Sequence, residues 1–442
     1  MVNRREEKNY EQKTRRSRAL FERAGRLIPG GVCHAIRYFH PYPFFAERAS
    51  GPRIWDVDGN EYVDFWMGHG ALILGHNPPN VVEALREQLG FGCQWGTVNE
   101  LELDLAEMVV RLVPSAEMVR FCNTGAEATM YACRLARGYT GRETIAKMEG
   151  GWHGFNSDLL YYVHGPFEAP ESLGLVPARD KIVPLPFNDT EETLARLQEY
   201  KDDLAAVIVE PVLGSGGFLP ADRQYLQALR DMCSEIGAVL IFDEIITCFR
   251  IAPGGGQEYY SIKPDLTCLG KILGGGLPIG AVAGASEILK LSNTIGQPKG
   301  SRVAIGGGTF SCNPLSMRAG LETLTYLDSH RSIYEKISVL GKKIREVVEN
   351  SLEVPGRTTR CTGTGSLFRA HFLKDPAAQL RSARDVHTNA DIVAREEVRL
   401  ALINRGIFTV EGGGMVSSSH GRDELKLLQE ACEDVSETSV GS

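Results

Sequence analysis

Three apolar stretches in the middle of the chain constrain the fold more than any other part of the sequence. They are LAAVIVEP at 204–211, Ala238–Phe242 and Leu266–Leu269, and a helical pattern from about Ala221 to Ile236 separates the first two. Near-continuous apolar strands that alternate with helices are typical of a parallel sheet covered on both faces. The sequence therefore predicts an α/β fold built around such a sheet.

Each of these stretches ends at a charged residue, in turn Glu210, Asp243 and Lys271. Ligands of open α/β sheets bind at the carboxyl ends of the strands. We therefore expect the three side chains to face one site. A single carboxylate at a strand end could be a helix cap, but three charged strand ends together favour a functional site.

Lys271 is followed by Ile272, Leu273 and three glycines, Gly274–Gly276. Burial at a strand end favours the neutral amine, which is the form that attacks a carbonyl group and makes a Schiff base. Taken alone, the stretch favours a lysine that merely caps the strand. A phosphate-binding P-loop is excluded, because Ile272 stands where that motif requires Ser or Thr.

A candidate phosphate site precedes these strands. The predicted strand Met118–Cys122 runs into NTGAEA at 123–128, and helical spacing continues to Arg137. A strand, a turn of small residues and a helix start present free backbone N–H groups at the positive end of a helix dipole, which suits a phosphate. The alternative is an ordinary helix cap by Thr124.

Two further glycine-rich segments carry polar or aromatic side chains. In Glu149–Gly154, EGGWHG, the tryptophan is framed by glycines, so its ring is either exposed for stacking or packed in a turn. Gly306–Pro314, GGGTFSCNP, opens a helix that we expect to reach about Tyr326.

The composition excludes several classes of partner. The length of 442 residues is enough for two domains, and the net charge of −8 argues against nucleic acid and anionic membrane. No apolar stretch could span a bilayer, and no signal-peptide core follows the charged residues 1–16. We expect a cytoplasmic protein, because the ten cysteines are scattered without a CxxC pair. The ten histidines show no metal-binding spacing, so no metal is expected.

Long, ordered motifs resemble those of the class-III, fold-type-I aminotransferases, which depend on pyridoxal 5'-phosphate (PLP). They are NTGAEA at 123–128, WHG at 152–154, VEPV at 209–212, FDEIITCFR at 242–250, PDLTCLGK at 264–271 and GGTFSCNP at 307–314. The resemblance covers roughly residues 25–430. Within the family, it is closest to the branch that contains glutamate-1-semialdehyde aminomutase.

The resemblance implies a two-domain architecture. The large PLP-binding domain would span 61–313, with a mostly parallel, seven-stranded type of sheet flanked by helices. A smaller α+β domain would combine the N-terminal segment 1–60 with residues 314–442. The resemblance also implies a homodimer in which two chains complete each active site.

The catalytic residues implied by the resemblance are Lys271 and Asp243. Lys271 would hold the cofactor as a Schiff base and then shuttle the substrate proton. Asp243 would keep the pyridine nitrogen protonated, which makes the ring an electron sink. Glu210 matches an acid near the ring and its oxygen substituent.

Further cofactor-binding residues follow from the same motifs. Ile245 and Trp152 would pack on opposite faces of the ring, with His153 next to Trp152 in the WHG motif; many relatives have tyrosine or phenylalanine in place of the tryptophan. The phosphate contacts would come from Gly125, Ala126 and, reaching the phosphate of the neighbouring subunit, Thr309.

The substrate-binding residues implied are Arg37, His69 and Glu411. Arg37, in VCHAIRYF, matches the arginine that holds the substrate carboxylate in the aminomutase. His69 replaces a tryptophan of the aminomutase pocket, and Glu411 lies where relatives vary. The cofactor apparatus is complete, whereas the substrate pocket departs from the aminomutase.

We therefore expect a PLP-dependent aminotransferase that moves an amino group between an amino acid and a keto acid or aldehyde. The first alternative is glutamate-1-semialdehyde 2,1-aminomutase, followed by an amino-acid racemase and then a non-catalytic relative. The presence of both Lys271 and Asp243 argues against the last, because a binding module needs neither.

Overall fold

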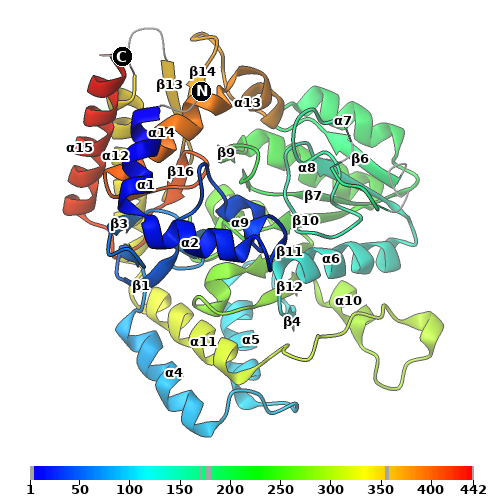
Figure 1. Ribbon diagram of the computed structural model, residues 1–442. Coiled ribbons are helices and arrows are strands. Elements are labelled where there is room, and N and C mark those ends of the chain that lie inside the picture. Colours follow the sequence, from blue (N-terminus) through cyan, green and yellow to red (C-terminus); the bar gives the residue numbers. More distant parts are fainter. Residues whose placement is uncertain (1–3, 170, 176–180, 354–357, 441–442) are drawn as a thin grey trace. The chain divides into compact units, whose positions relative to one another are not determined.

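The computed structural model describes residues 4–169, 171–175, 181–353 and 358–440. The chain forms two compact units, and Figure 1 labels most of their helices and strands. The larger unit comprises Pro79–Tyr334 and Gln379–Thr388. The smaller unit comprises Met1–Pro78, Glu335–Ala378 and Asn389–Ser442.

The larger unit contains a seven-stranded sheet. In chain order its strands are β4 (Met118–Cys122), β5 (Thr144–Met148), β6 (Ile182–Leu185), β7 (Leu204–Val209), β10 (Val239–Asp243), β11 (Leu266–Gly270) and β12 (Gly280–Gly284). Their order across the sheet is β4-β12-β11-β10-β7-β5-β6, and β12 is antiparallel to both of its neighbours while the other strands are parallel. The expected α/β fold with a mostly parallel sheet is confirmed.

Helices flank this sheet. The helices of the larger unit are α4 (Pro79–Phe91), α5 (Glu100–Leu112), α6 (Gly125–Thr140), α7 (Thr190–Glu199), α8 (Arg223–Ile236), α9 (Gly255–Tyr260), α10 (Ser286–Leu289), α11 (Pro314–Ser329) and α13 (Ala383–Asn389). Short 3₁₀ turns η4 (Lys271–Gly274), η5 (Lys290–Ser292) and η6 (Lys299–Ser301) and a small hairpin, β8 (Val212–Leu213) with β9 (Leu219–Pro220), complete the unit.

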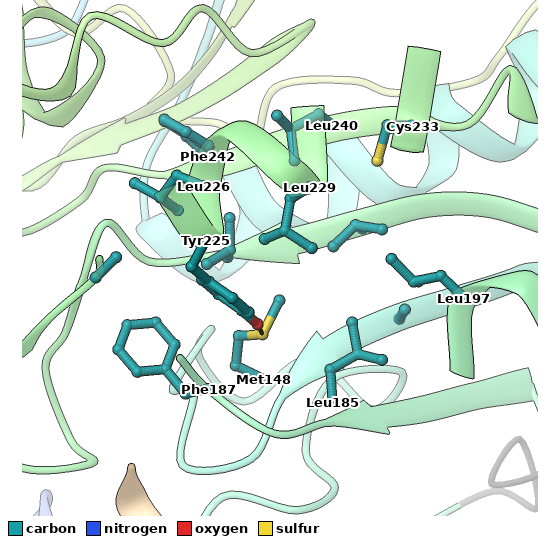
Figure 2. Close-up of a cluster of buried hydrophobic side chains, with 14 of the residues drawn as sticks. Met148, Leu185, Phe187, Leu197, Tyr225, Leu226, Leu229, Cys233, Leu240 and Phe242 are labelled. Carbon is teal, nitrogen blue, oxygen red and sulfur yellow. Dashed lines mark hydrogen bonds between the residues drawn. The ribbon is translucent and has the colours of Figure 1, made fainter. Parts of the chain in front are cut away.

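The sheet buries both of its faces, which explains why its strands are almost wholly apolar. One apolar cluster joins α7 and α8 to alternate strand residues such as Met148 and Leu240, and Figure 2 shows Tyr225, Leu226 and Leu229 of α8 among them. A second cluster joins α6 to the intervening strand residues, such as Ile145. Every residue of β5, β7, β10 and β11 is buried.

The sequence patterns do not single out β5, β6 or β12. In β12, GAVAG, glycines and alanines replace the bulky side chains by which strands are recognised. Close packing requires this composition: a Cβ built on Gly280 would lie 2.1 Å from the carbonyl oxygen of Thr124. A strand of glycines and small apolar residues shows little of the hydrophobic pattern by which strands are predicted from sequence.

The smaller unit combines helices with two small sheets. Its elements are α1 (Arg4–Lys13), α2 (Arg15–Ala24), η1 (Pro29–Gly31), η2 (Ala35–Arg37), β1 (Ala46–Ser50), β2 (Arg53–Asp56), β3 (Glu61–Asp64), α3 (Met67–Gly70), α12 (Ser332–Ser351), β13 (Thr358–Thr362), β14 (Leu367–Leu373), α14 (Ile392–Asn404), β15 (Ile407–Phe408), β16 (Gly413–Met415) and α15 (Arg422–Val440). The sheet orders are β1-β2-β3-β15 and β13-β14-β16.

The bounds of the compact units differ from the boundaries expected at 60/61 and 313/314. β3 pairs with β15, so the N-terminal part of the smaller unit extends beyond residue 60. α11 packs on α4 and α5, so it belongs with the larger unit although it follows residue 313. Within the described residues, no helix is both long and apolar enough to cross a membrane.

Candidate active site

A buried acid–imidazole pair lies at the end of β10. Oδ2 of Asp243 is 2.7 Å from Nδ1 of His153, and the two side chains are 3% and 0% exposed. Oδ1 of Asp243 accepts a hydrogen bond of 3.2 Å from the backbone amide of Ile245. Both carboxylate oxygens are therefore engaged, and the carboxylate has a fixed orientation.

His153 is expected to be neutral in this pair. Burial lowers the pKa of the imidazole, and the adjacent Asp243 carboxylate opposes that effect. Nε2 has no hydrogen-bond partner among the described residues, which suits an unprotonated nitrogen better than a buried N–H donor. The single proton then lies on Nδ1 and is donated to Asp243.

Lys271 follows β11 directly and begins η4, with a left-handed φ of 48°. Its side chain is partly buried, and burial lowers the pKa of its ammonium group. Asp243 and Glu210 act in the opposite direction, so the structure brings the three expected charges within electrostatic reach of one another. An amine with a lowered pKa at a strand end is suited to attack a carbonyl group.

Glu210 follows β7 and is 4% exposed. Its Oε1 accepts a hydrogen bond from the backbone amide of Trp152 at 2.9 Å, and its Oε2 accepts one from Gly214 at 3.0 Å. Burial and the nearby Asp243 raise the pKa of Glu210 to about 8. Glu210 can therefore hold or release a proton near neutral pH, and it also fixes the backbone at Trp152.

The start of α6 has the features of an anion site. Thr124 and Glu127 form a capping box, in which the side chain of each accepts a hydrogen bond from the backbone amide of the other. The amides of Gly125 and Ala126, in the first turn, have no carbonyl partner within the helix. These amides form the positive end of the helix dipole, where a phosphate is stabilised.

Ile245 packs directly on this helix start. A Cβ on Gly125 would lie 2.5 Å from Cδ1 of Ile245, so only glycine leaves room for the isoleucine. The structure therefore brings together the phosphate candidates on α6 and the segment that follows Asp243. The indole of Trp152 is partly exposed and meets the ring of Phe155 edge-on, with centroids 4.9 Å apart.

Thr309 lies in an exposed segment before α11. Its carbonyl accepts a hydrogen bond from the side chain of Gln94. Two residues later, Oγ of Ser311 accepts a hydrogen bond of 3.3 Å from Asn123, the residue that precedes Thr124. The segment therefore runs beside the start of α6, and the Thr309 residue is itself exposed.

The expected substrate residues all lie in the smaller unit. The ring of His69 stacks on that of His34, with centroids 5.2 Å apart at 18°, and Arg37 is exposed three residues after His34. Glu411 is held by an ion pair of 3.1 Å with the buried Arg369. His34 contacts His69 and lies within electrostatic reach of Arg37, whereas Glu411 is already engaged by an arginine.

Sequence reasoning missed two buried cations of the larger unit. Lys147 is enclosed within β5, and Arg250 is buried at the end of the FDEIITCFR motif. Burial lowers the pKa of Arg250 to about 10, and its charge contributes to the lowered pKa of Lys271. A charged residue inside an otherwise apolar stretch, as in TIAKM at 144–148, was the available signal. In the described part of the chain, no three metal-ligating side chains gather to form a metal site.

Comparison with known proteins identifies the family. Residues 36–416 match the model of the class-III aminotransferases. A glutamate-1-semialdehyde 2,1-aminomutase of Methanopyrus kandleri is 41% identical over 98% of this chain and 100% of its own length. One of Methanothermobacter thermautotrophicus is 40% identical over 95% and 98%. The chain belongs to the class-III aminotransferase family.

Solved structures agree with this assignment. An omega-transaminase from Sphaerobacter thermophilus has a TM-score of 0.87 at 37% identity, with coverage of 95% of this chain and 97% of its own. A glutamate-1-semialdehyde aminomutase from Pseudomonas aeruginosa has a TM-score of 0.86 at 22% identity, with coverage of 98% and 96%, which shows the shared fold. The expected cofactor, PLP, is confirmed for this family enzyme.

Proposed function

We propose that the protein moves an amino group with PLP bound at the strand ends of the larger unit, and that Lys271 binds the cofactor aldehyde. The observation that carries this proposal is the amine of Lys271, with its lowered pKa, next to the buried Asp243–His153 pair. When bound, PLP supplies an electron sink for negative charge on the carbon that carries the substrate amino group.

The residues of this chain fit the cofactor. The carboxylate of Asp243, oriented by His153, would hold a proton on the ring nitrogen. The amides of Gly125 and Ala126 would bind the phosphate, and Ile245 and Trp152 would pack against the ring. Glu210, with its raised pKa, would hold a proton close to the ring.

Two amino-transfer reactions compete as the specific activity. The curated relatives named above support glutamate-1-semialdehyde 2,1-aminomutase, in which the amino group moves from carbon 2 to carbon 1 of the same molecule. This alternative fits them better than the intermolecular aminotransferase expected from the sequence, so we place it first.

A specific observation favours the aminotransferase as second candidate. His69 stands where the aminomutase has a tryptophan, and it stacks on His34 rather than presenting an indole. The 37% identity to an omega-transaminase agrees with a substrate other than glutamate-1-semialdehyde. In either reaction, Arg37 binds the substrate carboxylate, because its planar fork of donors matches a carboxylate.

One assay separates these reactions. The holoenzyme is given glutamate-1-semialdehyde with no second amino donor or acceptor, and formation of the isomer 5-amino-4-oxopentanoate is measured. Conversion supports the aminomutase. No conversion, together with amino transfer from a panel of α-, β- and ω-amino acids to keto acids, overturns the aminomutase and supports the aminotransferase. Inversion of an amino acid without amino transfer would indicate a racemase, and no turnover a non-catalytic relative.

We also propose a homodimer with shared active sites. Apolar side chains are exposed near Thr309: Phe310 follows it, and Phe91 and Trp95 lie close in the chain to Gln94, whose side chain donates a hydrogen bond to the carbonyl of Thr309. An asparagine of the same region, Asn99, donates a hydrogen bond of 3.1 Å to the carbonyl of Cys312. A second copy of the chain that covers these side chains would bring Thr309 to the neighbouring phosphate.

The ten unpaired cysteines support a reducing compartment such as the cytoplasm.

A further inference from the structure

Lys147 is a lysine enclosed in the interior of the larger unit. It lies within β5, opposite Pro184 of β6 and Ile208 of β7, and the residue is 0% exposed. An ammonium group is strongly hydrated in water and costly to bury without partners. Burial lowers the pKa of Lys147 to about 7, against the opposing charges of Glu210 and Glu171.

The ammonium group of Lys147 donates all of its hydrogen bonds to one stretch of backbone. Nζ donates hydrogen bonds to the carbonyl oxygens of Gly151 at 2.8 Å, Leu159 at 3.0 Å and Tyr161 at 2.6 Å. Only the protonated amine has three donors, so the three carbonyl acceptors favour the charged form of Lys147 against the effect of burial. The three carbonyls bracket residues 151–161, a segment that is neither helix nor strand.

This segment carries residues of the proposed cofactor site. Between the carbonyls of Gly151 and Leu159 lie Trp152, whose amide donates a hydrogen bond to Glu210, and His153, whose Nδ1 faces Asp243. Thr129 of α6 donates a hydrogen bond of 2.7 Å to the carbonyl of His153. The segment has no helix or sheet ladder, and its few backbone turn bonds, such as that from the amide of Leu159 to the carbonyl of Asn156, leave these side-chain bonds to fix much of its shape.

We propose that Lys147 is a positioning residue of the cofactor site: by gathering the carbonyls of Gly151, Leu159 and Tyr161, it holds Trp152 and His153 where they meet Glu210 and Asp243. The inference rests on the proposed function, because it assigns a role toward the same cofactor. Lys147 does not touch the reacting atoms in this role, and it acts through the segment 151–161.

The charge of Lys147 adds a second effect. It lowers the pKa of His153, in the same direction as burial and against Asp243. His153 therefore remains neutral with its proton on Nδ1, and Asp243 keeps the negative charge that the ring nitrogen requires. An apolar side chain at position 147 removes both the three backbone bonds and this charge.

The test compares Lys147→Met, which keeps the length of the side chain, with Lys181→Met. Lys181 lies just before the neighbouring strand β6, but its side chain is 40% exposed and pairs with Glu143 and Asp203 at the surface. Amide hydrogen exchange is followed on the cofactor-free proteins, and the dissociation constant of PLP is measured by equilibrium dialysis. ¹⁵N-histidine NMR gives the pH at which His153 takes up a second proton, with His153→Gln assigning its signals.

In Lys147→Met, we expect faster exchange within residues 149–161, weaker PLP binding and protonation of His153 at a higher pH. The loss in affinity should be on the order of tenfold, as for one lost charge-assisted hydrogen bond. Lys181→Met should match the wild type in all three measurements. Should Lys147→Met not fold, Lys147→Gln keeps a donor without the charge and should show the same shift of His153.

Two results would overturn the inference. One is wild-type exchange within 149–161 together with wild-type PLP affinity in the folded variant. The other is faster exchange that is no greater in this segment than in β7 or β10, because Lys147 would then contribute only general stability. Hydrogen exchange needs no cofactor, so it tests the role of Lys147 even if the proposed function fails. Failure of the proposed function would instead appear as a missing cofactor label on Lys271 of the wild type.

Discussion

The Oδ2 atom of Asp243 and the Nδ1 atom of His153 lie 2.7 Å apart, although the two residues are 90 positions apart in the chain. A carboxylate held by a neutral imidazole and by the amide of Ile245 keeps one orientation and one charge. This pair is the most specific element of the proposed cofactor site.

Asp243→Asn should bind PLP but lose most of its turnover, because an amide does not stabilise a proton on the ring nitrogen. We expect kcat to fall by roughly 100-fold or more, the range of a lost proton-transfer or electrostatic partner. Steady-state kinetics and equilibrium dialysis measure the two effects separately. Asp231→Asn, on the exposed side of α8, is the matched control. Turnover near that of the wild type would show that the ring nitrogen is not controlled from Asp243.

Borohydride reduction of the holoenzyme should label Lys271 with the cofactor and leave Lys147 unlabelled. Burial lowers the pKa of both lysines, so the neutral amine alone does not distinguish them. Access of the cofactor to the amine does distinguish them. Lys147 is fully enclosed and its three donors are all bonded, whereas Lys271 is partly exposed. Peptide mapping by mass spectrometry identifies the site, and a label on any lysine other than Lys271 contradicts the assignment.

Glu210 should make the protein less stable as the pH rises. Its pKa in the folded protein is about 8, above its ordinary value of 4.5. Between these values the folded protein holds a proton that the unfolded chain releases, so the free energy of unfolding decreases with pH in this window. Glu210→Gln does not titrate. Its free energy of unfolding, minus that of the wild type, should therefore rise from about pH 5 to about pH 8 by up to a few kcal/mol.

Urea unfolding of the cofactor-free proteins at several pH values measures this difference. A constant offset is expected in addition, because a glutamine offers one acceptor oxygen where Glu210 accepts from both Trp152 and Gly214. Glu235→Gln, exposed on α8, controls for the general effect of removing a carboxylate. A difference that does not vary with pH would mean that Glu210 is ionised throughout.

Gly125→Ala should weaken PLP binding and stability, because the new methyl group would lie 2.5 Å from Cδ1 of Ile245. Overpacking of this kind typically costs about 1–3 kcal/mol, measured by urea unfolding. Ile245→Val removes the clashing atom and should restore part of the loss in the double variant. Gly90→Ala, in α4 with open space around it, is the control and should be neutral. A Gly125→Ala protein as stable as the wild type would refute the close packing.

A dimer with shared sites should regain activity when two defective chains are combined. Co-expressed Lys271→Ala and Thr309→Ala chains form hybrids in which one site has both an intact Lys271 and an intact Thr309. At equal amounts, about a quarter of all sites should be intact. The purified hybrid is compared with each parent dimer, and sedimentation gives the oligomeric state. Activity no higher than the mean of the parents, or a fully active monomer, would contradict shared sites.

The sequence predicted the sheet and its charged strand ends because both are local signals. β7, β10 and β11 are mostly apolar, and the charged residue at or just after the end of each is visible in the chain itself. The pairing of His153 with Asp243 could not be predicted from the residues alone, because a segment without regular structure brings them together. Lys147 was missed for a related reason: a lysine in a strand ordinarily marks a solvent-facing position, and only three carbonyls of the irregular segment after β5 make it an interior residue.

The strand β12 also sets the separation between the turn before α6 and the turn that begins at Lys271. Gly280, at its start, pairs with Cys122 of β4 on one side and with Gly270 of β11 on the other. The turn that leads into α6 and the turn that begins at Lys271 are thus separated by one intervening strand, or roughly 10 Å as two interstrand spacings. β12 therefore acts as a spacer between the turn before α6 and Lys271, and its first residue must be glycine because the carbonyl of Thr124 occupies the place of a Cβ.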